Sequence, residues 1–230
     1  MKNKKGSHLG IVFSLIIFVG FLVFLYIIAA PGLIPQKDKT LAMEQLKIKL
    51  PESFSADLTE VSLLLIAAPG GDCAEINHFT GFETLNYIVK DKNKNPIGSS
   101  SLGVLLEMAF TGDTFYKLFY SEEPFDNFPR SGDCETTTYN IESSKTSKKV
   151  FETKIVEFIG IYNDDYEDLK ESLNIAFETD FSFKFTDKDG LVVGPDITDK
   201  TLEIYVEEIP LEYVDAEANL NPGILTISVW

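Results

Sequence analysis

The side chains best suited to catalysis are few and widely spaced in this chain. His78 is the one histidine outside the amino-terminal segment, so a Ser-His-Asp arrangement would have to be built around it. Its neighbours supply no nucleophile motif, and the sequence has no Gly-x-Ser-x-Gly, phosphate loop or His-Glu-x-x-His. Acidic pairs abound, but a chain with 36 acidic residues contains such pairs by chance. The sequence therefore predicts no catalytic residue, no cofactor and no enzyme activity.

Two short acidic segments could supply oxygen ligands to a cation. Residues 91–95 imitate the first half of a calcium loop, but Pro96 stands where glycine is needed and Leu102 where a bidentate glutamate is needed. Residues 187–190, Asp-Lys-Asp-Gly, have the composition of a hairpin turn. The sequence therefore predicts two turns and no metal site.

The two cysteines, Cys73 and Cys134, follow the same dipeptide, Gly-Asp. Both fall in the part of the chain that we expect to be exported, where oxidation is permitted. A disulfide between them would stabilise the fold by about 4 kcal/mol, because it restricts the unfolded chain. Two free thiols or a metal pair are the alternatives, although His78, five residues after Cys73, gives a poor zinc spacing. We predict the disulfide.

An uncharged apolar segment, residues 9–30, dominates the amino-terminal part of the chain. As a helix it would extend roughly 33 Å, enough to cross a hydrocarbon core of about 30 Å. Lys2, Lys4 and Lys5 precede it, and basic residues beside a membrane span stay in the cytoplasm. A cleaved secretion signal is the alternative, but its apolar region normally has about 7 to 15 residues. The sequence predicts a single-pass protein of the cell membrane, with a cytoplasmic amino terminus and an extracytoplasmic carboxyl-terminal domain.

These features divide the chain into four parts. We expect a cytoplasmic basic leader (1–8), a transmembrane helix (9–30), a juxtamembrane linker with a short helix (31–60) and an extracytoplasmic domain (61–230). Removing the three leader lysines from the 20 Lys and Arg residues leaves 17 against 36 Asp and Glu, a balance of −19. Such a surface repels nucleic acid.

Strands dominate the expected domain. Apolar runs between polar turns predict strands at 61–67, 84–89, 102–110, 114–120, 136–142, 181–185, 202–208 and 223–230. Residues 150–162 suit a helix or a strand, and their β-branched and aromatic side chains favour a strand. From Asp164 to Ala176, apolar residues at steps of three and four predict an amphipathic helix. The predicted fold class is α+β: one N-terminal transmembrane helix followed by a mainly antiparallel β-sheet domain packed against one amphipathic helix.

A short basic leader that ends in Lys-Gly, here Lys4-Lys5-Gly6-Ser7, directly precedes the apolar segment. It resembles the class III signal of archaeal type IV pilin-like proteins. The carboxyl-terminal quarter of the chain also resembles uncharacterised archaeal single-pass proteins with such leaders, at residues 166–175, 180–183, 208–215 and 229–230. The resemblance implies that the leader is cut between Gly6 and Ser7 while the apolar helix is retained.

The sequence departs from pilins at two places. Pilins extend the apolar helix outward as a long spine, whereas Pro31, Gly32 and Pro35 predict that the helix ends near the membrane surface. The fifth residue after the implied cut is Ile11, where bacterial pilins have a glutamate. We therefore expect an anchor rather than a filament spine.

The expected function is that of a membrane-anchored extracytoplasmic domain with a structural or interaction role at the cell surface, of which a minor pilin-like subunit is one form. The alternative is a non-catalytic extracytoplasmic module that binds a ligand or a cation, given the balance of −19 in the 17 basic and 36 acidic residues. The expected partners are the lipid bilayer, through residues 9–30, and other pilin-like or surface proteins, with no nucleic acid.

Overall fold

The structure of the protein is a computed structural model that describes residues 6–77, 81–82, 84–102, 104–130, 132–195 and 204–230, with the side chains of 6–9, 27–38 and 102 outside the description. Its helices are α1 (Gly6–Ser53), α2 (Glu152–Asp164) and α3 (Tyr166–Ser172). The strands of the amino-terminal half are β1 (Ser55–Leu65), β2 (Cys73–Asn77), β3 (Asn86–Lys90), β4 (Pro96–Ile97), β5 (Ser99–Leu102), β6 (Leu105–Ala109) and β7 (Phe115–Ser121). The later strands are β8 (Cys134–Thr136), β9 (Tyr139–Phe151), β10 (Phe181–Thr186), β11 (Val192–Val193), β12 (Tyr205–Val214) and β13 (Leu220–Val229).

These strands form two sheets. The larger has nine strands in the order β11-β10-β13-β12-β9-β1-β7-β3-β4, and the smaller has four in the order β5-β6-β2-β8. Neighbouring strands are antiparallel except for two parallel pairs, β9 with β12 and β2 with β8. The parallel contact of β9 with β12 is short, and it joins the carboxyl-terminal hairpin to the rest of the large sheet.

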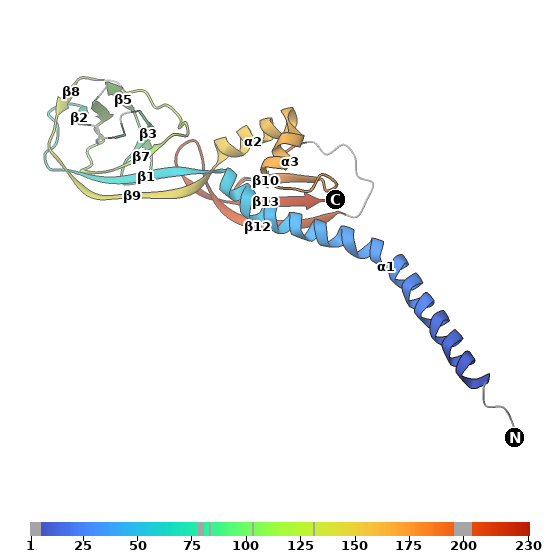
Figure 1. Ribbon diagram of the computed structural model, residues 1–230. Coiled ribbons are helices and arrows are strands. Elements are labelled where there is room, and N and C mark those ends of the chain that lie inside the picture. Colours follow the sequence, from blue (N-terminus) through green and yellow to red (C-terminus); the bar gives the residue numbers. More distant parts are fainter. Residues whose placement is uncertain (1–5, 78–80, 83, 103, 131, 196–203) are drawn as a thin grey trace.

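The long strands β1 and β9 pair along most of their length and connect two lobes (Figure 1). The helical lobe contains α2, α3, β10 to β13 and the carboxyl-terminal part of α1; the distal lobe contains β2 to β8. Each lobe has its own buried apolar core. A smaller buried cluster, which includes Phe151 and Val214, lies where β9 meets β12.

This architecture contradicts the predicted fold class. The chain is a mixed α/β protein, mostly sheet, and it has two sheets and several helices where one sheet and one amphipathic helix were expected. The physical reason is that alternation of apolar and polar residues indicates that a segment is extended, but does not specify its neighbours. The partition into two sheets depends on long-range pairing, such as β1 with β9.

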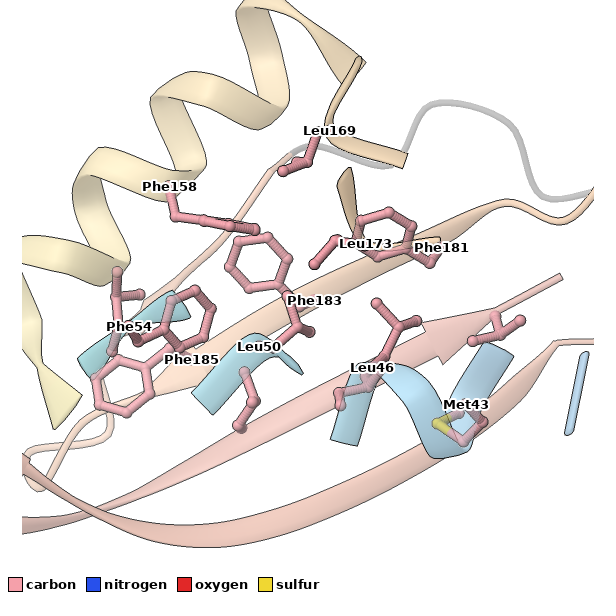
Figure 2. Close-up of a cluster of buried hydrophobic side chains, with 14 of the residues drawn as sticks. Met43, Leu46, Leu50, Phe54, Phe158, Leu169, Leu173, Phe181, Phe183 and Phe185 are labelled. Carbon is pink, nitrogen blue, oxygen red and sulfur yellow. The ribbon is translucent and has the colours of Figure 1, made fainter. Parts of the chain in front are cut away.

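The carboxyl-terminal part of α1 is a core element of the helical lobe. Ala42, Met43, Leu46 and Leu50 recur at helical spacing and are buried, with Leu46 and Leu50 fully inaccessible. Figure 2 shows Met43, Leu46 and Leu50 in one apolar cluster with side chains of α2 and β10. Phe54, just after the helix, contacts the ring of Phe158 on α2 with ring centroids 5.1 Å apart.

The predicted end of the first helix at Pro31 to Pro35 is wrong. Helix α1 runs without interruption for 48 residues from Gly6 to Ser53. Proline removes one backbone donor and crowds the preceding turn, but in a long helix this local cost can bend the helix rather than end it. The short helix expected at 39–50 is therefore the last part of this element, and Pro51 lies in its final turn.

The prediction of a transmembrane helix at residues 9–30 is also corrected. Across the helical residues that the structure describes, no stretch is both long and apolar enough to cross a membrane. This finding contradicts the predicted single-pass location in the cell membrane, together with the cytoplasmic amino terminus and extracytoplasmic domain. Physically, the helix does not end where a membrane surface was expected, because the same helix continues into the core of the helical lobe.

Most of the strand predicted at 150–162 is a helix: β9 ends at Phe151, and the residues from Glu152 onward are helical. Helix α2 begins at Glu152, and its Ile155 and Phe158 are buried in the core of the helical lobe. Strand propensity is outweighed here by contacts with Phe54 and Phe183, which are distant in the sequence. The amphipathic helix expected from Asp164 to Ala176 is real but shorter, since α3 covers Tyr166–Ser172.

Candidate functional site

The structure places the predicted turns as expected. Oδ1 of Asp91 accepts backbone hydrogen bonds from Asn93 at 2.8 Å and Asn95 at 2.9 Å. Although burial would raise the pKa of Asp91, these hydrogen bonds hold it below its ordinary value. Asp187 closes its own turn in the same way, with Asp189 and Leu191 as the donors. Both carboxylates are thus occupied by the turns that they close.

The other candidates for chemistry form no metal centre in the described part of the chain. His78 lies outside the described residues. Among those that are described, no group of three or more His, Cys, Asp or Glu side chains could hold a metal ion. Of the acidic pairs, Glu123 accepts a hydrogen bond from Thr153 at 2.6 Å, and Glu207 pairs with Lys47 at 2.7 Å. These carboxylates connect elements of the fold.

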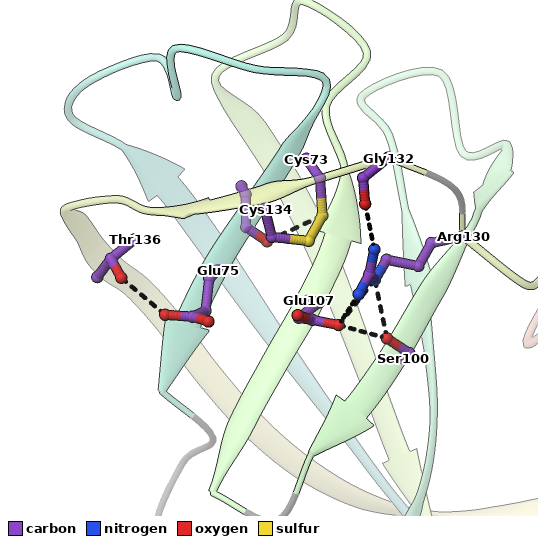
Figure 3. Close-up of a disulfide and its surroundings, with 9 residues drawn as sticks. Cys73, Glu75, Ser100, Glu107, Arg130, Gly132, Cys134 and Thr136 are labelled. Atoms are coloured by element: carbon purple, nitrogen blue, oxygen red, sulfur yellow. Dashed lines mark hydrogen bonds and ion pairs between the residues drawn. A yellow bond between two sulfur atoms is a disulfide. The ribbon is translucent and has the colours of Figure 1, made fainter.

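The predicted disulfide between Cys73 and Cys134 is confirmed (Figure 3). The two cysteines are register partners on the parallel strands β2 and β8, with their Cα atoms 4.4 Å apart. Strand β8 pairs with the small sheet only over a short parallel stretch beside β2. The disulfide links β8 covalently to that sheet. This geometry removes the alternatives of two free thiols and of a metal pair.

An ion pair between the buried Glu107 and the half-buried Arg130 lies near the disulfide and was not predicted from the sequence (Figure 3). Nε of Arg130 donates to Glu107 at 2.7 Å and to Ser100 at 3.0 Å. Hydrogen bonding from Ser100 is the main reason that the pKa of Glu107 lies below its ordinary value; burial opposes it and Arg130 reinforces it. Arg130 is the single arginine of the chain, which is the one signal in the sequence that could have identified it.

The strongest candidate for an interaction site is the amino-terminal part of α1, residues 10–26, which we name the apolar arm. Every residue of the apolar arm is exposed. Its fourteen large hydrophobic side chains are between 45% and 73% accessible, and they cover all faces of the helix. The arm projects away from both lobes (Figure 1). Large contiguous apolar patches are rarely exposed on monomeric soluble proteins and are typical of interaction sites, which makes the arm the candidate.

The implied processing site, Gly6 and Ser7, lies at the beginning of this helix. These two residues are the first of α1, and residues 1–5 of the leader lie outside the described part of the chain. Cleavage between Gly6 and Ser7 stays a prediction. A chain cut there would keep the whole apolar arm.

Comparisons of the chain with models of protein families, with curated proteins and with solved structures find no match. The function proposed below therefore depends on the geometry of α1 and on the resemblance of the leader.

Proposed function

We propose that the protein is a pilin-like structural subunit that assembles with other copies of itself through the apolar arm. The observation that carries the proposal is the division of α1 into two parts. Its carboxyl-terminal part is buried in the core of the helical lobe, whereas residues 10–26 are exposed on every side. A helix that is apolar all round is normally buried by other apolar surface. Among the described residues, the single chain supplies no such surface to the arm.

The same arm from other copies is the occupant that fits best. Because the arm projects beyond the lobes, arms from several copies can pack together while the lobes remain outside the bundle (Figure 1). Burying one large apolar side chain contributes about 1.5 to 3 kcal/mol, so the arm exceeds an association cost of about 4 to 15 kcal/mol with only part of its surface covered. The net charge of −16 keeps the rest of the chain solvated and limits lateral aggregation of the lobes.

The continuity of α1 adds support from the resemblance. The resemblance to pilin-like proteins implies a helix that extends from the apolar segment into the domain. Pro31 and Pro35 were expected to interrupt such a helix. Since α1 is continuous from Gly6 to Ser53, contacts made by the arm are transmitted directly to the helical lobe. The proposed role is therefore a structural spine and replaces the expected anchor.

Two valines allow a matched test. Val23 on the arm and Val156 on α2 are both on helices and have similar accessibility, 52% and 56%. The full chain is purified in mild detergent, the detergent is removed, and the product is examined by analytical ultracentrifugation and negative-stain electron microscopy. The wild type and Val156→Asp are expected to form ordered assemblies, and Val23→Asp is expected to remain monomeric, because a carboxylate would be buried among apolar arms.

Two results would contradict the proposal. One is a wild-type chain that stays monomeric or gives only shapeless aggregates after detergent removal. The other is assembly of Val23→Asp and Val156→Asp to the same extent.

A further inference from the structure

One face of the large sheet carries a groove of about 350 Å³ that is rich in lysine. Strands β3, β7, β1 and β9 form its floor, and the hairpin between β12 and β13 covers one side. Five lysines line the groove against one glutamate, although the whole chain has a net charge of −16. We name it the lysine groove; its lysines are Lys90, Lys94, Lys117, Lys145 and Lys149.

The sheet register brings these cations together. Lys90 on β3 is the direct register partner of Lys117 on β7, and Lys145 on β9 is the partner of Glu60 on β1. Like charges placed opposite each other destabilise a sheet, so this arrangement has a cost unless an anion lies between them. Glu60 compensates part of it through an ion pair with Lys117.

The remaining positive charge of the groove is poorly compensated. Among the described residues, no carboxylate forms an ion pair with Lys94 or Lys145. Lys149 has a partner, Glu212, but the separation is 3.6 Å and the Glu212 side chain is 70% exposed. The groove therefore has more cations than its own carboxylates can neutralise.

Lys90 is a second and independent feature of the groove. The residue is only 2% exposed, and its ammonium donates to Oδ1 of Asn219 at 2.7 Å and lies 5.4 Å from the ring centroid of Phe119. An ammonium has three donors, and a buried one is costly unless acceptors surround it. Burial lowers the pKa of Lys90, with Lys94 adding to the effect and Asp215 and Glu217 opposing it. An anion in the groove would supply acceptors beyond the one that the described residues give to Lys90.

We infer that the lysine groove binds a small polyanion, a compound with at least two phosphate or carboxylate groups. The volume of about 350 Å³ suits a small molecule, and the side chains of Leu58, Phe119 and Leu220 can contact its uncharged part. The proposed ligand is therefore an anion, whereas the net charge of the sequence favoured a cation as the alternative ligand. The inference is independent of assembly through the apolar arm.

Inorganic pyrophosphate and citrate are suitable probes, because they distinguish phosphate from carboxylate recognition. Binding of each to the full chain is measured by isothermal titration calorimetry in low-salt buffer at neutral pH. The test variant is the double substitution Lys94→Gln with Lys145→Gln, which leaves the buried Lys90 unchanged. The control is Lys148→Gln with Lys184→Gln, two exposed lysines outside the groove; Lys148 is on β9 beside the test position but faces away from the groove.

At least one probe is expected to bind the wild type, and the test variant should bind it about tenfold more weakly, since two close charges are lost. The control variant should keep its affinity within about twofold, because it loses the same total charge from lysines that do not line the groove. Circular dichroism and thermal melting verify that both variants are folded. The inference is overturned if neither probe binds at millimolar concentration, or if both variants lose affinity equally.

Discussion

Nζ of Lys90 and Oδ1 of Asn219 lie 2.7 Å apart, so a buried cation on β3 is held by the hairpin between β12 and β13. The two residues are 129 positions apart in the sequence. This hydrogen bond connects the outer part of the large sheet to the hairpin that belongs to the helical lobe. The free energy of unfolding should therefore include a contribution from the Asn219 side chain.

Replacing Asn219 with alanine should therefore lower the free energy of unfolding by about 2 to 3 kcal/mol, because the buried ammonium loses its acceptor. Asn221→Ala is the matched control, since Asn221 donates to Asp215 at 2.7 Å, whereas the Lys90 ammonium donates to Asn219. The control should lose only about 1 kcal/mol. Urea denaturation at neutral pH measures both, and equal losses would show that Lys90 does not depend on Asn219.

The Glu107 carboxylate should make the stability of the protein depend on acidic pH. Its pKa is lowered from 4.5 by Ser100, against burial and with help from Arg130. A carboxylate with a lowered pKa stabilises the fold above its unfolded pKa, and this contribution is lost as the pH falls through the folded pKa. Glu107→Gln should be less stable than the wild type at pH 7, by about 1.5 to 3 kcal/mol, and the difference should shrink as the pH falls below the unfolded pKa and through the lowered folded pKa. A difference that is independent of pH would contradict this account.

Reduction of the Cys73–Cys134 disulfide should lower the free energy of unfolding by about 4 kcal/mol, because it releases a loop of 61 positions in the unfolded chain. Guanidinium denaturation with and without a phosphine reductant measures the loss. The double substitution of both cysteines by alanine is the control, and reductant should not change its stability. A wild type that is equally stable in both conditions would contradict the prediction.

Leu46→Ala should destabilise the protein by about 2 to 5 kcal/mol, because Leu46 is fully buried in the core that α1 shares with α2 and the strands. Ile48→Ala, two residues further along the same helix, should change stability by less than about 0.5 kcal/mol, since Ile48 is 69% exposed. Thermal and urea denaturation of the two variants give the comparison. If both were neutral, the carboxyl-terminal part of α1 would not be a core element.

Local patterns predicted the parts of the fold that depend on local interactions. The alternation of Phe181, Phe183 and Phe185 predicted β10 correctly, because each of these side chains is buried on one face of the strand. The turns at Asp91 and Asp187 were also predicted correctly. Each depends on local interactions, because the aspartate accepts hydrogen bonds from backbone groups within four residues.

The remaining features depend on contacts between distant residues. Helix α2 was predicted as a strand because the partner of Phe158, Phe54, is about a hundred residues away and its contact has no local signature. The continuity of α1 was not predicted, because Pro31 and Pro35 disfavour a helix locally. The buried contacts that stabilise the carboxyl-terminal part of α1 involve residues distant in the sequence. The lysine groove could not be predicted either. Its lysines come from β3, β7 and β9, and only the strand order β9-β1-β7-β3 brings these strands together.

The central claim is that residues 10–26 of α1 associate with the same residues of other copies. The most direct measurement is a cryo-electron microscopy reconstruction of the assemblies formed by the full chain. We predict a core of packed α1 helices in which Val23 is buried between subunits, with both lobes on the outside. A reconstruction in which copies contact each other through their sheets, while the apolar arms remain unpaired, would contradict the claim.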